Sequence, residues 1–129
     1  MRLPLALPIL LGACSPGAGI DPTGVPLTMA TEGIGDVVLA EDHLLLDDGS
    51  RLPVRRLGEG VYALPSRPVR LPNGADFCSG QPVGYLTLHR TTDGLIAMNV
   101  GDWPAPPAPP PADALAAEGA CATFTYRPA

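Results

Sequence analysis

Two neighbouring runs of alternating residues constrain the fold of this chain more than any other feature. Residues 83–89 place Leu86 and Leu88 on one face, and residues 95–100 likewise place their apolar side chains on one face. A short polar segment, residues 90–94, joins the two runs. Alternation with a period of two is typical of an antiparallel sheet with one buried face. We therefore expect a β-hairpin here and a sheet at the centre of the fold.

Shorter candidate strands precede and follow this hairpin. They are residues 36–40, 43–46, 51–56, 60–64, 68–71 and 121–127, with turn signals at residues 47–50 and at Asn73-Gly74. Prolines at positions 53, 65, 68 and 72 cannot donate ladder hydrogen bonds, so several of these strands should be edges or irregular. The fold class predicted is mainly β, as a small antiparallel sheet that forms a meander, a sandwich or a partial barrel.

The region before the last strand is rich in proline. Residues 102–111 should form an extended polyproline connector. Residues 112–118, ended by Gly119, predict one short C-terminal helix. Trp103 begins the connector, and we interpret it as packing the connector onto the domain. The alternative for Trp103 is stacking on a sugar or on a partner.

The N-terminus has the parts of a secretory signal. Arg2 is followed by an apolar run, residues 3–13, which is far shorter than the about 20 residues needed to span a bilayer. The run ends in Leu11-Gly12-Ala13-Cys14, which resembles the lipobox of bacterial lipoproteins. The resemblance implies that the Cys14 sulfur receives a diacylglyceryl group. It also implies that the chain is cut before Cys14 and that the new amine is acylated, usually with palmitate or a similar chain.

This resemblance divides the chain into three parts. Residues 1–13 become a lipoprotein signal peptide, residues 14–25 a lipidated cysteine with a flexible tether, and residues 26–129 a single β domain that includes the proline-rich connector. Because Ser15 is not aspartate, the sorting rule of the family implies a lipid anchor in the outer membrane of a bacterial envelope, facing the periplasm.

Lipid on Cys14 leaves Cys78 and Cys121 as the remaining pair. Two cysteines in an exported domain most simply form a disulfide, and a loop of this length would contribute about 4 kcal/mol in the chain-entropy model. The alternative is a metal site that also uses His43 and His89. The spacing of neither residue type supports such a site, so we expect no metal and no cofactor.

Charge narrows the range of partners. The formal net charge of −5 argues against nucleic acid. Five arginines nevertheless fall close together, and guanidinium groups suit phosphates and carboxylates. They are Arg51, Arg55, Arg56, Arg67 and Arg70. We treat them as a possible anion-binding patch. The alternative is that they lie on solvated strand surfaces, where nearby acids balance their charge.

No catalytic residue is predicted. His43 and His89 are the two histidines, Ser79 lacks a Gly-x-Ser-x-Gly elbow, and the adjacent Asp47 and Asp48 suit a turn better than an acid–base pair. The predicted function is a non-enzymatic binding or structural module of the bacterial envelope, attached to the membrane by lipid. Its expected partner is an envelope protein or peptidoglycan.

Two alternative functions remain. The chain is similar in size, acidity and plan to the membrane-bound lysozyme inhibitors of bacteria, which suggests a periplasmic inhibitor of lysozyme-like enzymes. The Ser-Gly-x-x-Tyr loop of that family is not reproduced, because four residues separate Ser79-Gly80 from Tyr85. The second alternative is a small hydrolase.

Overall fold

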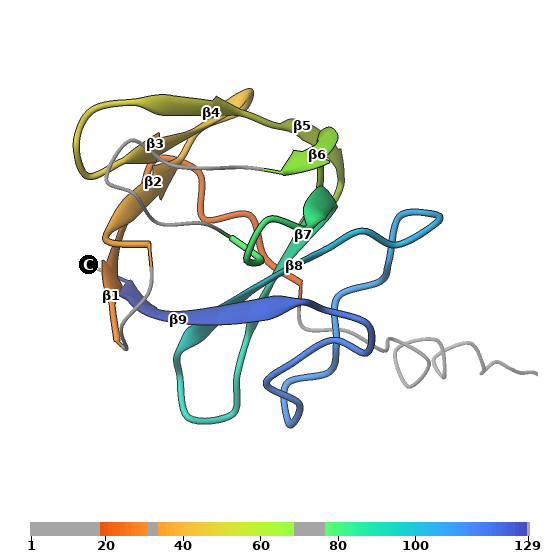
Figure 1. Cartoon of the computed structure of the whole chain (residues 1–129). Coiled ribbons are helices and arrows are strands. Elements are labelled where there is room, and N and C mark those ends of the chain that lie inside the picture. Colours follow the sequence, from red (N-terminus) through yellow and green to blue (C-terminus); the bar gives the residue numbers. More distant parts are fainter. Residues whose placement is uncertain (1–18, 31–33, 69–76, 129) are drawn as a thin grey trace, which may run out of the picture.

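A computed structural model describes residues 19–30, 34–68 and 77–128. In this part of the chain, nine strands form one sheet in which every neighbouring pair is antiparallel (Figure 1). The strands are β1 (Pro26–Met29), β2 (Val37–Leu39), β3 (His43–Leu46), β4 (Arg51–Pro53), β5 (Arg55–Gly58), β6 (Val61–Pro68), β7 (Pro82–Arg90), β8 (Ile96–Gly101) and β9 (Ala122–Pro128). Their order in the sheet is β4-β3-β2-β1-β9-β8-β7-β6-β5.

The sheet is a nearly closed, barrel-like meander. Each described strand pairs with the next in sequence except β4, which does not pair with β5, and β1 pairs with β9. One residue, Val54, separates β4 from β5, and a single residue cannot reverse the chain. The Val54 amide donates to the Asp42 carbonyl at 3.0 Å, so hydrogen bonding beside β3 continues to Val54. Pairing with β6 begins at the next residue, Arg55. The two short strands are therefore halves of one bent strand, which runs across the top of Figure 1.

The sequence-based expectations hold for most of the sheet. The mainly β class is confirmed, and the hairpin predicted at residues 83–100 corresponds to β7 and β8. The strand predicted at 51–56 is divided at Val54. The strand predicted at 68–71 and the turn at Asn73-Gly74 lie outside the described residues, apart from Pro68, which ends β6.

Apolar side chains from all around the sheet fill its interior. Leu88, Met98 and Phe124 are paired across β7, β8 and β9, and all three belong to the buried core. Two tyrosines, Tyr62 and Tyr126, are among the largest fully buried side chains. An eight-stranded barrel has an interior that side chains just fill, and counting β4 and β5 as one strand gives this size.

The strand β8 is buried on both faces, unlike an ordinary antiparallel strand. Its outward face is covered by the segment between β8 and β9, residues 102–120, which we call the strap and which is the blue chain at the right and bottom of Figure 1. Asn99 on β8 holds the strap: its Nδ2 donates to the Leu115 carbonyl at 3.4 Å, and its Oδ1 accepts from the Ala117 amide at 3.0 Å. The Thr123 hydroxyl on β9 donates to the same Oδ1 at 2.6 Å.

Two further side chains hold the strap, one from the sheet and one from within the strap itself. His89 on β7 is fully buried, and its Nε2 donates to the Ala114 carbonyl at 2.6 Å. The indole Nε1 of Trp103 donates to the Glu118 carbonyl at 2.8 Å. The strap is therefore fixed by polar groups of the sheet, since it has no strand ladder of its own.

The C-terminal helix predicted at residues 112–118 is wrong. The described strap contains turns and bends in this segment and no helix. A helix needs its carbonyl groups for bonds to later amides of the same segment. Here the Ala114 carbonyl instead accepts from His89, and the Ala117 amide instead donates to Asn99, both side chains outside the segment. Tertiary hydrogen bonds have replaced the local helical pattern.

A disulfide joins the end of the strap to the loop before β7. Cys78 and Cys121 are bonded, with Cα atoms 5.6 Å apart and a sequence separation of 43, as the cysteine count predicts. Next to this bond, Phe77 packs against Phe124 with ring centroids 6.0 Å apart. The bond thus fixes the start of β9 beside the aromatic end of the core.

Replacement of Asn99 tests whether the strap depends on this one side chain. Asn99→Ala leaves a buried amide, a carbonyl and a hydroxyl without a partner, so we expect a loss of about 2–4 kcal/mol in the free energy of unfolding. Urea unfolding followed by circular dichroism measures the loss, and Thr92→Ala, at an exposed position of the β7–β8 turn, is the control. A loss below about 0.5 kcal/mol for Asn99→Ala, the range of ordinary surface changes, would contradict this role.

Candidate functional site

The chain reaches the sheet before its first strand. Gly19 forms an isolated bridge with His89, and the Ile20 amide donates to the Leu88 carbonyl at 3.2 Å. The tether predicted at residues 14–25 lies partly outside the described residues. From Gly19 onward, the structure places it against the end of β7, with Ile20 and Val25 packed on the core, rather than away from the domain.

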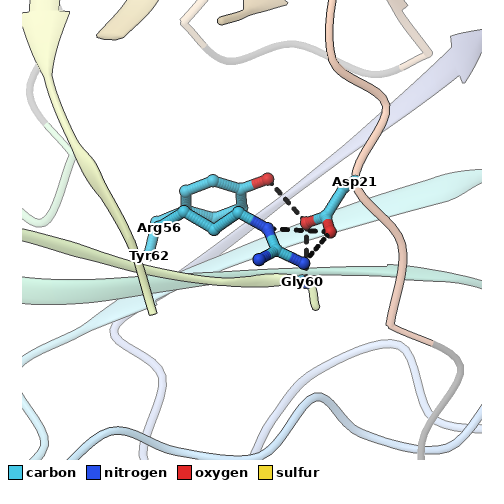
Figure 2. Close-up of polar contacts among 4 residues, drawn as sticks. All are labelled: Asp21, Arg56, Gly60 and Tyr62. Carbon is cyan, nitrogen blue, oxygen red and sulfur yellow. Dashed lines mark hydrogen bonds and ion pairs between the residues drawn. The ribbon is translucent and has the colours of Figure 1, made fainter. Parts of the chain in front are cut away.

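Asp21 is the polar centre of this attachment (Figure 2). Its Oδ2 accepts from Nε of Arg56 at 3.0 Å and from Nη2 at 2.6 Å. Its Oδ1 accepts from the Gly60 amide at 2.9 Å and from the Tyr62 hydroxyl at 2.7 Å. One carboxylate therefore connects the N-terminal segment to β5, to β6 and to the turn between them. We call Asp21, Arg56, Gly60 and Tyr62 the latch.

The latch changes the acid–base behaviour of its members. Burial opposes ionisation of Asp21, but the hydrogen bonds from Arg56, Gly60 and Tyr62 together outweigh it and lower the pKa of this carboxyl below its usual value. The pKa of the Tyr62 hydroxyl is raised, first by burial and then by its bond to Asp21. Gly60 lets the β5–β6 turn approach β7 closely, because a Cβ on Gly60 would lie 2.5 Å from the Leu88 carbonyl oxygen. The φ of Gly60, +75°, also favours glycine.

A lowered pKa makes the latch sensitive to acid. The pKa of Asp21 is lower in the folded state than in the unfolded state, so ionised Asp21 stabilises the fold. Its contribution to the free energy of unfolding is complete above the unfolded pKa of about 3.9 and is lost as the pH falls through the lower folded pKa. We expect Asp21→Asn to lower the free energy of unfolding by about 2 kcal/mol at pH 7, and the difference from wild type to shrink below about pH 4.

Chemical unfolding between pH 7 and pH 3 measures this difference. Asp113→Asn removes an exposed carboxylate of the strap and serves as the matched control. If the difference in the free energy of unfolding between wild type and Asp21→Asn stays constant from pH 7 to pH 3, the charge of Asp21 does not stabilise the latch.

A surface groove lies between the strap and the β5–β6–β7 part of the sheet. It follows one row of residues that are paired across four neighbouring strands. The row consists of Arg55, Ala63, Tyr85 and Gly101. The hollow has a volume of about 380 Å³, within the range of about 300–1,000 Å³ that is typical of small-molecule sites.

Small residues and the first part of the strap shape this groove. Ala63 and Gly84 line it from β6 and β7, whereas Trp103, Pro104 and Pro106 line it from the strap. Trp103 is itself positioned by glycine, because a Cβ on Gly101 would lie 2.9 Å from the indole ring. The Trp103 side chain thus packs the strap onto the domain, as predicted, and also lines the groove.

Charged groups stand on both sides of the groove. Arg55 and Leu57 line it from β5, and Asp102 lines it from the end of β8. In the part of the chain that the structure describes, Arg55 is exposed and forms no ion pair. Arg55 also lines a second hollow, with Pro53 and Val54, at the junction of β4 and β5. A ligand in the groove would therefore meet one cation that forms no ion pair with the described acids, and the carboxylate of Asp102 on the other side.

The predicted arginine patch is divided by the fold. Arg56 is bound to Asp21, and Arg51 lies on β4, where it helps to lower the pKa of Asp42 after the larger effect of His43. Arg55 faces the groove. The side chain of Arg67 and the whole of Arg70 lie outside what the structure describes.

Arginine and proline occupy the two strand edges at the open junction of the sheet. Arg51 and Pro53 are on β4, and Arg55 and Arg56 are on β5. Charged side chains and proline on edges discourage pairing with the edge of another sheet. This role accounts for the clustering of three of the arginines in sequence without a shared ligand.

The residues that the hydrolase alternative would need are not brought together into one site. His89 is buried under the strap, and His43 is hydrogen-bonded at 2.8 Å to the exposed carboxylate of its neighbour Asp42. Ser79 is exposed, with a positive φ of 53°, in the turn beside the disulfide. Asp48 accepts hydrogen bonds from Ser50 in the β3–β4 turn, as its position in a turn suggests.

Two further properties of the described residues concern metal binding and membrane spans. No group of three or more histidine, cysteine, aspartate or glutamate side chains in residues 19–30, 34–68 and 77–128 is arranged to hold a metal ion. Within the same ranges, no helix has the length and apolar character needed to cross a membrane. Cys14, the predicted lipidation site, lies outside them.

Comparisons with protein-family models, with curated proteins and with solved structures found no match for this chain.

Two residues of these sites were missed from the sequence. Asp21 lies in a segment that reads as a tether because of its glycines and prolines, and Tyr85 reads as an ordinary strand residue. A period-two count would have placed Tyr85 on the face opposite Leu86 and Leu88, and hence outside the core. No local signal identifies Asp21, because its partners lie 35 to 41 positions away in the chain.

Proposed function

We propose that this chain is a lipid-anchored, non-enzymatic binding module of the bacterial envelope, and that the groove between the strap and β5–β7 is its binding site. The groove is the observation that supports a binding role: it combines two aromatic side chains, Trp103 and Tyr85, with the cation of Arg55, which forms no ion pair among the described residues. The tetrapeptide that ends in Cys14 supports the anchor.

The anchor would keep this groove close to a membrane surface. Lipid contributes about 0.8 kcal/mol per buried CH₂ group, and two or more acyl chains on one cysteine are enough for stable attachment. A site on an anchored domain samples a small volume and meets its ligand at a high effective concentration, so a modest intrinsic affinity is sufficient. This suits a shallow groove with one charged contact.

Metabolic labelling tests the anchor. In a Gram-negative host that expresses the full chain, we expect labelled palmitate to be incorporated into the wild-type protein and not into Cys14→Ser. The wild-type protein should sediment with outer membranes. Cys78→Ser leaves the predicted anchor intact and should keep the label. A wild-type protein without label would contradict the anchor.

A substitution in the groove tests the binding role. Ala63→Gln places a larger neutral side chain at the centre of the groove, and Thr28→Gln makes a comparable change at an exposed position of β1. We expect detergent-solubilised wild type and Thr28→Gln to be retained on purified cell envelopes about tenfold more strongly than Ala63→Gln, because lost contacts of 1.4 kcal/mol change an equilibrium constant by that factor. Equal retention of all three proteins would contradict the groove as the site.

A further inference from the structure

The aromatic side chains of the groove favour a ligand with flat C–H surfaces. Trp103 and Tyr85 are both half-buried, and both line the same hollow. Aromatic rings offer a large contact area at a low cost in conformational entropy, and their polar ends tolerate water. The ring of a sugar presents C–H groups on its flat faces and hydroxyl groups at its edge, and so fits a site that is aromatic and open to solvent.

The guanidinium of Arg55 favours a carboxylate on that ligand. The planar guanidinium of Arg55 can donate two parallel hydrogen bonds to a carboxylate, and no acid in the described chain forms an ion pair with it. Asp102 lines the opposite side of the same groove, so a carboxylate of the ligand would bind on the side of Arg55. Neutral sugars would leave this cation without a partner.

The described surface suits a protein partner less well. A stable protein interface buries about 800 Å² on each side and is centred on large apolar side chains. Among the residues that the structure describes, Leu57 and Leu115 are the large hydrophobic side chains that are exposed. Only Leu57 of these two lines the groove. A groove at which Leu57 is the one exposed large aliphatic side chain among the described residues fits a glycan strand better.

From these observations we propose that the groove binds a carboxylate-bearing glycan of the cell wall, in which a sugar ring packs against Trp103 and Tyr85 and a carboxylate of the attached peptide pairs with Arg55. This ligand class is that of peptidoglycan fragments. The inference rests on the proposed function, since it names the envelope component that the groove would bind.

Trp103 provides a direct measurement. It is the one tryptophan of the chain, so intrinsic fluorescence reports on the groove without a label. We would titrate the detergent-solubilised full-length protein with a soluble disaccharide–peptide fragment of peptidoglycan. Three matched probes are the same fragment with its carboxylates methyl-esterified, the disaccharide alone, and the free peptide.

The intact fragment should change the fluorescence saturably. Arg55→Gln should weaken its binding about tenfold, the effect expected for a hydrogen-bonded charge, and the esterified fragment should bind wild type about as weakly. Arg127→Gln removes an exposed arginine of β9, away from the groove, and should bind like wild type. Circular dichroism of each variant verifies that it is folded.

Several results would overturn the inference. They are the absence of a saturable change with the intact fragment, equal binding by wild type and Arg55→Gln, and equal binding of the free peptide and the glycopeptide. If any of these occurs while retention on envelopes still depends on Ala63, the ligand class is wrong and the proposed binding role stands. If retention is also independent of Ala63, both proposals fail.

Discussion

The double burial of β8 is the constraint on which the rest of the structure depends. Its inward side chains complete the core, and its outward face would expose the small residues Ala97 and Gly101 and the amide of Asn99. The strap covers this face, and the buried side-chain amide of Asn99 forms three hydrogen bonds there, two to the strap and one to β9. The strap begins directly after Gly101 and returns to β9, and this path places Trp103 beside the groove. The groove is therefore a result of how β8 is buried.

The bent strand formed by β4 and β5 has a corresponding role on the other side of the groove. Val54 is buried at the bend, so the strand leaves β3 and joins β6 without leaving the core. The change of direction turns Arg55 toward the strap and Arg56 toward Asp21. Two adjacent arginines thus act at different sites: one holds the N-terminal segment, and the other remains available to a ligand.

Period-two patterns predicted the class of fold and most strands, because in a meander each strand pairs with the next and little long-range information is needed. The closing pair, β1 with β9, and the bend at Val54 have no local signal. The helix predicted at residues 112–118 failed for a related reason, since side chains from β7 and β8 determine the backbone of the strap. The candidate site was predicted in pieces: Trp103 and Arg55 were singled out, but their shared groove depends on register across four strands.

The pairing of β1 with β9 has a consequence for the time course of folding. These strands lie near opposite ends of the described chain, and β9 joins the first half of the sheet to the second. Contacts this distant in sequence form slowly, because a long loop must close before they contribute. During synthesis, the two halves of the meander can form but cannot be joined until Ala122–Pro128 has been made. The last strand therefore completes the barrel, and a chain shortened at this end would leave two exposed sheet edges.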